Sequence, residues 1–240
     1  KYLSQGEISQ ISITNAKNQY AKMARLEREL GINLNYTPVV DLELEKNSII
    51  AQKKRSFSDN YRKVAAYARI VIQEHEKQKI ITSMKHFPGH GSVTGDTHKG
   101  FIDATDTFKN TELMPYKMLI DTYELSTVMV SHIYNSNFDE NYPASMSEKT
   151  VKGLLKGDLG YRGVVISDDF DMGAVRKNYK LDEIVKRAVI SGIDLMIFSG
   201  DVIINFKEEN ENIHKYETSN KIFFSITTAN ITSSFLDFQV

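Results

Sequence analysis

The amino-acid sequence predicts an α/β fold built on a parallel β-sheet with helices packed outside it. Five short apolar runs rich in β-branched residues alternate with helical patterns between residues 14 and 198. Two of these runs, VVIS at 164–167 and LMIF at 195–198, are apolar without alternation, as expected of strands that are buried on both faces. Repeated strand–helix units of this kind give either a doubly wound sheet or a closed barrel.

The helices are indicated by apolar periodicity and by residues typical of helix ends. The first is predicted over residues 14–30, with Tyr20, Met23 and Ala24 on one side and Gly31 as the C-terminal cap. The remaining helices are predicted over residues 59–78, 111–125, 147–156 and 181–191.

The strands are predicted over residues 32–40, 80–87, 127–133, 163–167 and 193–198. After Asp201 the pattern weakens: residues 207–212 form a charged run typical of a loop or an exposed helix, and residues 221–240 are apolar and β-prone. We therefore expect residues 1–240 to form one domain and assign no structure to its C-terminal part, residues 202–240.

The composition is that of a globular protein: 41% of residues are apolar and 25% are charged. Lys and Arg number 30 against 31 Asp and Glu, so the charge gives no reason to expect a nucleic acid or an anionic membrane as a partner. The absence of cysteine excludes disulfides, thiolate metal ligands and a cysteine nucleophile. No apolar run approaches the roughly 20 residues that a membrane-spanning helix needs, and we expect a monomer.

Polar residues gather where the predicted strands end, which is where barrel enzymes place their chemistry. This placement predicts an enzyme independently of any resemblance to a known family. The strand-end residues are Asp41, Lys85–His86, His132, Asp168–Asp169 and Ser199–Asp201.

The densest cluster of such residues is the run KHFPGHG at 85–91, which is followed by Asp96 and His98. Its glycines allow the loop conformations that other residues avoid. An Asp two residues before a His can accept the imidazole Nδ1 proton, which fixes the tautomer and raises the pKa of the His. A His held in this way can donate a proton to a leaving oxygen and later take one from water.

A second cluster, SDDFDM at 167–172, follows a buried strand. Asp168 lies where this strand opens into the predicted site, a suitable position for a carboxylate nucleophile or a charge stabiliser. Its neighbour Asp169 points the opposite way if the strand geometry continues.

These two elements together resemble the β-N-acetylglucosaminidases of glycoside hydrolase family 3. The pattern KHFPGHG-x4-D-T-H followed by VVISDDFDM carries the resemblance, and NLNYTPVVDL, the RSF at 55–57 and GIDLMIF support it. The similarity extends from about residue 24 to 198. The first element is specific, because it separates the acetylglucosaminidases from the glucosidases of the same family, which use a distant Glu.

The resemblance implies a (β/α) barrel of TIM type whose single catalytic domain hydrolyses terminal β-linked N-acetylglucosamine with retention of configuration. Asp168 would be the nucleophile, His98 the acid/base and Asp96 its orienting partner. No metal and no organic cofactor is implied. The residues expected to bind hydroxyl groups of the terminal sugar are Arg55, Lys85 and His86.

The substrate that the resemblance suggests is a muropeptide from peptidoglycan recycling, and a chitooligosaccharide remains an alternative. We expect a cytoplasmic location, with the periplasm or secretion as alternatives. Members of the family carry an upstream D-x-E-G-G-x-V-x-R element that this sequence lacks. We therefore expect the N-terminal strands of the barrel to be absent from this chain.

Other interpretations remain open. Asp169 could be the nucleophile, or phosphate could replace water as the acceptor. The chain could be an inactive, sugar-binding remnant of the fold. It could also be a metal-dependent barrel hydrolase, although H-x-H and H-E-x-x-H spacings are missing and Lys85 would repel a cation. The residues that such a zinc site would use are His86, His90, Asp96 and His98.

Overall fold

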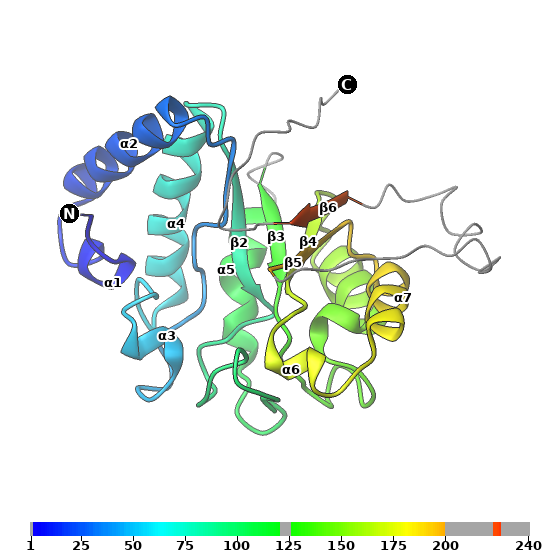
Figure 1. Cartoon of the computed structure of the whole chain (residues 1–240). Helices are drawn as coiled ribbons and strands as arrows, with labels where there is room; N and C mark the ends of the chain where they lie inside the picture. The colour runs from blue at the N-terminus through cyan, green and yellow to red at the C-terminus, as the bar shows by residue number, and fades with distance from the viewer. Residues whose placement is uncertain (1, 121–125, 200–222, 227–240) are drawn as a thin grey trace.

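The computed structural model describes residues 2–120, 126–199 and 223–226, and its centre is a curled parallel sheet (Figure 1). The strand order follows the chain, so each strand pairs in parallel with the next one. This is the arrangement that repeated β/α units predict. The strands are β1 (Leu34–Asn35), β2 (Ile81–Phe87), β3 (Thr127–Val130), β4 (Val165–Asp169), β5 (Leu195–Phe198) and β6 (Phe223–Ile226).

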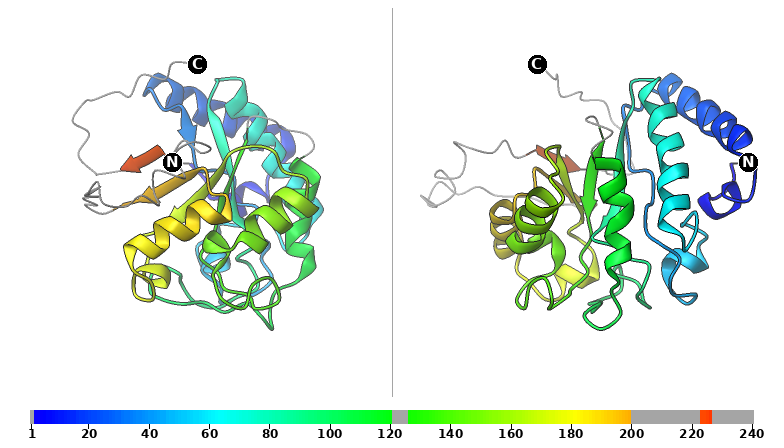
Figure 2. Two further views of the ribbon diagram at one scale, coloured as in Figure 1. Left: turned by 90° about the vertical axis from the view of Figure 1, so that its right-hand side faces the viewer. Right: turned by 180° about the vertical axis from the view of Figure 1, so that it is seen from behind.

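Helices connect β1 to β5 in turn and pack along one side of the sheet (Figure 2). Helix α2 packs on α4, and α4 packs on both α5 and β2. The longer helices are α2 (Ile13–Glu29), α4 (Tyr61–Glu76), α5 (Met114–Ile120), the π-helix η3 (Lys149–Asp158) and α7 (Leu181–Ser191). Short helical turns are α1 (Gln5–Ile8), α3 (Ile49–Gln52), η1 (Asn110–Leu113), η2 (Ala144–Met146) and α6 (Gly173–Arg176).

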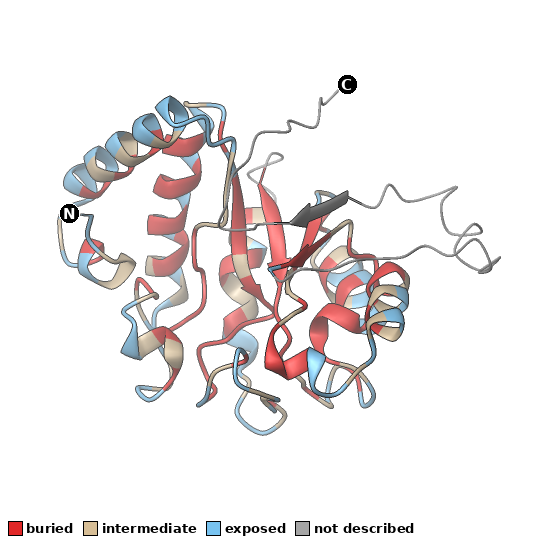
Figure 3. Cartoon of the chain, viewed as in Figure 1, coloured by how far each residue is buried: buried red, intermediate tan, exposed pale blue. Residues whose placement is uncertain are grey.

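Alternate side chains of the strands enter two separate hydrophobic clusters, because successive residues of a strand point to opposite faces. The larger cluster lies between the sheet and the helices and includes Val128, Val165 and Met196. On the opposite face, Met129 and Ile166 belong to a small cluster with the neighbouring strands. Figure 3 shows most of β2, β3, β4 and β5, and the inward sides of the helices, as buried. The sheet is therefore covered on both faces, and its polar residues collect at the strand ends.

The helix ends carry caps of the usual kinds, and the predicted cap Gly31 is among them. The side chain of Ser12 caps α2 by accepting the N–H of Asn15 at 3.2 Å. Gly31 follows the end of that helix with φ of 81°, and Gly192 ends α7 with φ of 98°. This left-handed conformation is the one that glycine adopts at helix C-termini.

The predicted parallel β/α arrangement is confirmed, and α7 has the predicted bounds of 181–191. The strand predicted over 32–40 is regular only at Leu34–Asn35. Pro38 has no N–H to donate, and the N–H of Val39 donates to Oε1 of Gln5 at 2.9 Å. The segment nevertheless stays beside β2, because the N–H of Val40 donates to the carbonyl of Lys85 at 2.7 Å.

Other bounds shift by a few residues. The strand predicted over 163–167 is β4, which begins at Val165 and includes Asp168 and Asp169. The strand predicted over 127–133 ends at Val130. The helix predicted over 147–156 runs from Lys149 to Asp158.

Some predictions concern residues that lie partly or wholly outside the described part of the chain. The helix predicted over 111–125 is η1 followed by α5 up to Ile120, and residues 121–125 are not described. The charged run 207–212 also lies outside the described residues, and only β6 is described within 221–240. Among the described strands, β1 and β6 form the two edges of the sheet. No described helix is both long and apolar enough to cross a lipid bilayer.

Candidate active site

A cleft of about 450 Å³ opens at the carboxyl ends of the strands. Its size is typical of sites for small ligands. All six site residues predicted from the sequence line this one cleft, although they come from four separate segments of the chain. They are Arg55, Lys85, His86, Asp96, His98 and Asp168. Residues that the sequence did not single out as binding residues also line it: Tyr36, Ile49, Lys53, His90, Thr97, Met129, Asp169, Met172 and Ile197.

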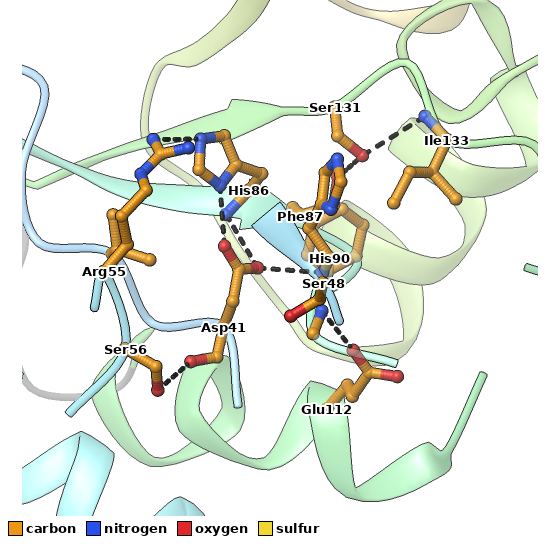
Figure 4. A network of polar contacts seen from close by, with 12 residues as sticks. Asp41, Ser48, Arg55, Ser56, His86, Phe87, His90, Glu112, Ser131 and Ile133 are labelled. Atoms are coloured by element: carbon orange, nitrogen blue, oxygen red, sulfur yellow. Dashed lines mark hydrogen bonds and ion pairs between the residues drawn. The ribbon is translucent and has the colours of Figure 1, made fainter. Parts of the chain in front are cut away.

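Beneath the cleft, a buried carboxylate organises the end of β2 (Figure 4). Oδ1 of Asp41 accepts the backbone N–H groups of His86 at 3.1 Å and of His90 at 2.9 Å. Its Oδ2 lies 2.6 Å from Nδ1 of His86. Burial alone would raise the pKa of Asp41, but its electrostatic and hydrogen-bonding interactions with His86, together with the electrostatic effect of His90, hold the pKa below its usual value. Asp41 is therefore an anion that holds the backbone of His86 and His90 in place.

On the cleft side of His86, Nε2 of its ring lies 3.2 Å from a terminal nitrogen of Arg55. Both ring nitrogens of His86 thus have partners within the protein. Burial lowers the pKa of His86, although the neighbouring Asp41 carboxylate opposes this shift. His86 accordingly favours the neutral imidazole at physiological pH.

Lys85 brings an amine into the same cleft. Burial and the positive charge of Arg55 lower its pKa from 10.5 to about 8, despite the opposing effects of Asp168 and Asp41. The amine nitrogen lies 6.0 Å from the ring centroid of Tyr36. Lys85 is therefore charged at neutral pH and loses its charge under mildly alkaline conditions.

The two adjacent carboxylates of β4 have different surroundings. Oδ1 of Asp169 accepts the backbone N–H groups of Asp171 at 3.0 Å and of Ser199 at 3.1 Å, so this side chain holds the turns that follow β4 and β5. Oδ1 of Asp168 accepts only the N–H of its neighbour Asp169, at 2.9 Å, among the contacts described. Asp168 is thus the carboxylate with more capacity to meet a ligand.

Asp168 is held in its ionised form. Burial would raise its pKa, but His86, His132, the N–H of Asp169 and the charge of Lys85 together keep the pKa below its usual value. An ionised carboxylate at the bottom of a cleft can act as a nucleophile or stabilise a positive charge.

His132, the strand-end histidine of β3, supports this region from below the cleft. Its Nε2 lies 2.9 Å from the carbonyl oxygen of Asp169, and its Nδ1 lies 2.7 Å from the hydroxyl of Ser145. Its ring stacks on Phe170 at 5.1 Å. These contacts occupy both ring nitrogens, so His132 holds the end of β4. It is not among the residues that line the cleft.

The loop that follows β2 is packed too tightly for side chains at two glycines. A Cβ on Gly91 would lie 1.6 Å from the carbonyl oxygen of Leu42, and one on Gly89 would lie 2.7 Å from Cβ of Glu112. Oε2 of the buried Glu112 accepts the N–H of Gly91 at 3.0 Å. The loop is therefore anchored at its start, and Glu112 is an anchor that no sequence motif signalled.

Further along this loop, Asp96 and His98 are in contact, but the Asp96 carboxylate does not bind the His98 ring as predicted. Oδ1 of Asp96 accepts the backbone N–H of His98 at 3.0 Å. Within the described residues, the ring of His98 makes no hydrogen bond, and the residue is exposed at the cleft. The N–H of Gly173 in α6 donates to the carbonyl of His98 at 3.1 Å, which fixes the main chain at this point.

The zinc-site interpretation finds no support in this geometry. Among the described residues, no group of three or more His, Asp or Glu side chains is arranged to hold a metal ion. Of the proposed ligands, His86 has both ring nitrogens engaged by Asp41 and Arg55.

Comparison with solved structures supports the predicted architecture. The structure of a glycoside hydrolase family 3 β-N-acetylglucosaminidase from a Paenibacillus strain is similar, with a TM-score of 0.73 and 27% identity. The similar region covers 82% of this chain and 38% of that one. The expected TIM-like (β/α) fold is thereby confirmed at the level of its parallel β/α sheet.

Comparison with known sequences gives the family. Residues 4–226 match the glycosyl hydrolase family 3 N-terminal domain. A protein named beta-hexosaminidase from Nitrosomonas eutropha is 33% identical over 175 residues, or 71% of this chain and 49% of that protein. One from Xylella fastidiosa is 33% identical over 186 residues, or 76% of this chain and 54% of that protein. The chain spans about half the length of these relatives, and it belongs to glycoside hydrolase family 3 through the N-terminal domain of that family.

Proposed function

We propose that this chain carries the active site of a β-N-acetylhexosaminidase that removes terminal, non-reducing β-linked N-acetylglucosamine. The observation that carries the proposal is the ionised Asp168 in a cleft that it shares with Arg55, Lys85 and His86. The names of the relatives, beta-hexosaminidase, support the same reaction.

In the first step, Asp168 attacks the anomeric carbon while His98 protonates the leaving oxygen. The glycosidic C–O bond breaks, and the sugar becomes esterified to the Asp168 carboxylate. In the second step, His98 takes a proton from water, the water attacks the anomeric carbon, and the carboxylate leaves. Two displacements at one carbon retain its configuration.

The surroundings of the two β4 carboxylates favour Asp168 over Asp169 as the nucleophile. Asp169 uses Oδ1 to bind two backbone N–H groups, so moving it toward a substrate would break both bonds. Asp168 accepts a single backbone N–H, that of its neighbour Asp169, among the contacts described. We assign Asp169 to holding the backbone behind the nucleophile.

The acid/base assignment rests on the position of His98 at the exposed side of the cleft, where a leaving group would depart. Asp96 holds the main chain of this residue. A rotation of the His98 ring toward the Asp96 carboxylate would create the pair expected from the sequence, and we propose that this pair forms when a substrate is bound.

The cationic and neutral nitrogen groups of the cleft suit a sugar rich in hydroxyls. Arg55 and Lys85 donate hydrogen bonds without accepting any, and the charge of Lys85 helps to keep Asp168 ionised. We propose that these two residues and His86 bind the hydroxyls of the terminal N-acetylglucosamine. We propose a muropeptide as the natural substrate and peptidoglycan recycling as the process. We further propose that the protein acts in the cytoplasm as a monomer.

The test is hydrolysis of an aryl β-N-acetylglucosaminide by the full chain and three variants. Asp168→Ala should abolish turnover, whereas Asp169→Asn, which keeps an acceptor oxygen for the two N–H groups, should lose far less. His98→Ala should impair substrates with poor leaving groups much more than those with good ones. If Asp168→Ala keeps the rate of the unchanged chain, the assignment is wrong.

The same preparation distinguishes the other interpretations. Sugar binding by calorimetry without any hydrolysis would favour a sugar-binding remnant. Formation of N-acetylglucosamine 1-phosphate when phosphate is added would favour phosphorolysis. Comparison of a muropeptide with a chitooligosaccharide tests the substrate, and cell fractionation and light scattering test the location and the monomeric state.

A further inference from the structure

Asp41 is a fully enclosed charged group beside the cleft, with an exposed fraction of 1%, yet it does not line the cleft. Three donors converge on its carboxylate: the N–H groups of His86 and His90 on Oδ1, and the ring of His86 on Oδ2. Figure 4 shows the continuous chain of contacts from Asp41 through the ring of His86 to Arg55.

The partners of His86 determine where its ring proton lies. Arg55 can only donate, so Nε2 of His86 must be the acceptor in the 3.2 Å contact. A neutral imidazole with an accepting Nε2 carries its proton on Nδ1. Nδ1 then donates to the Asp41 carboxylate, which agrees with the short distance of 2.6 Å.

We infer that Asp41 is a positioning residue that fixes His86 in the Nδ1–H tautomer and thereby makes Nε2 the acceptor that holds Arg55 in the cleft. The opposite tautomer would turn the Nδ1 lone pair toward a carboxylate and an Nε2–H toward the guanidinium. Both contacts would become repulsive. The consequence for turnover rests on the proposed function, whereas the tautomer itself does not.

The amide variant Asp41→Asn reverses this arrangement without changing its shape. The oxygen of the new amide is expected to remain at the Oδ1 position, because turning it away would leave the N–H groups of His86 and His90 facing an NH₂ group. The NH₂ group then faces Nδ1 of His86, which must become an acceptor. The ring proton moves to Nε2, and the contact with Arg55 is lost.

The direct test is nitrogen NMR of the histidine side chains in the full chain, with the His86 signals assigned from their loss in His86→Gln. We expect the Nδ1–H form in the unchanged chain and the Nε2–H form in Asp41→Asn. Arg55→Met should keep the Nδ1–H form, because Asp41 and not Arg55 sets the tautomer.

A matched control is Asp139→Asn, which makes the same chemical change at another buried aspartate. Asp139 accepts the hydroxyl of Ser147 at 2.7 Å and the N–H of Asn141 at 2.9 Å, and it does not line the cleft. This variant should leave the His86 signals unchanged. An Nε2–H form in the unchanged chain, or an Nδ1–H form that persists in folded Asp41→Asn, would overturn the inference.

If Asp41→Asn does not fold, the unchanged chain and Arg55→Met still decide the question. Loss of the Nδ1–H form in Arg55→Met would show that the guanidinium sets the tautomer and would refute the role of Asp41. Retention of this form would support that role.

Kinetics of aryl β-N-acetylglucosaminide hydrolysis provide the second readout. If Asp41 acts through Arg55, Asp41→Asn should raise KM roughly tenfold with a smaller change in kcat, as expected for lost substrate binding. The double variant Asp41→Asn/Arg55→Met should be no worse than Arg55→Met alone, because both changes remove the same contact. Fully additive losses would contradict the inference. An unchanged chain without hydrolase activity would refute the proposed function and leave the NMR result intact.

Discussion

Substitution of Gly91 by alanine tests whether the tight packing of the loop after β2 holds the site together. The added Cβ would lie 1.6 Å from the carbonyl oxygen of Leu42, which is 1.8 Å closer than the 3.4 Å at which ordinary contacts begin. Leu42 follows Asp41 directly and is fully buried, so the segment cannot easily retreat. The loop must move instead and give up the 3.0 Å bond from Gly91 to Glu112.

The expected cost combines overpacking, about 1–3 kcal/mol, with the loss of a hydrogen bond to a buried carboxyl group, about 1–3 kcal/mol. A total on the order of 3 kcal/mol corresponds to a fall in Tm of about 6–12 °C for a chain of this length. Thermal unfolding followed by circular dichroism measures this fall. We also expect kcat/KM to drop at least about tenfold, because the loop carries His90, Asp96 and His98.

Gly100→Ala is the control, since a Cβ there meets no atom within 4 Å. Its effect should remain within about 0.5 kcal/mol. If Gly91→Ala is as stable and as active as Gly100→Ala, the loop does not depend on this close approach and the reasoning is refuted.

Two further predictions concern Lys85 and His132. Because the pKa of Lys85 is about 8, KM should rise as the pH increases through this value and the amine loses its charge. Lys85→Arg should remove that rise, and a KM that stays flat in the unchanged chain would count against a binding role for the charge. His132→Phe keeps a ring that can stack on Phe170 but leaves Ser145 and the carbonyl of Asp169 without their 2.7 and 2.9 Å partner. It should lower the free energy of unfolding by about 2 kcal/mol, measured by urea denaturation, and an unchanged denaturation midpoint would contradict this role.

Much of the fold follows from periodicity and caps. Helix α7 has the bounds of 181–191 that the sequence pattern predicts. Local propensity predicts one strand over residues 32–40. The regular strand is shorter because the N–H of Val39 donates to Gln5, a distant residue that a local pattern cannot include. Similarly, the extension of β4 to Asp169 depends on pairing with β5, which is a contact between distant segments.

The sequence predicted which residues line the site better than it predicted how these residues contact one another. The motifs that carry the family resemblance indicated six residues, and all six line one cleft. The spacing of Asp96 and His98 suggested a contact to the ring, whereas the carboxylate holds the backbone N–H. The role of Asp41 depends on a partner 45 residues away, so no local pattern could indicate it.

The most direct measurement of the central claim is the mass of the His98→Ala chain during reaction with an aryl β-N-acetylglucosaminide that has a good leaving group. The first step needs little acid assistance with such a group, whereas the second lacks its base. The account predicts a covalent adduct of one N-acetylglucosaminyl unit that accumulates and maps by peptide digestion to Asp168. An adduct on Asp169, or hydrolysis with no covalent adduct at any time, would contradict it.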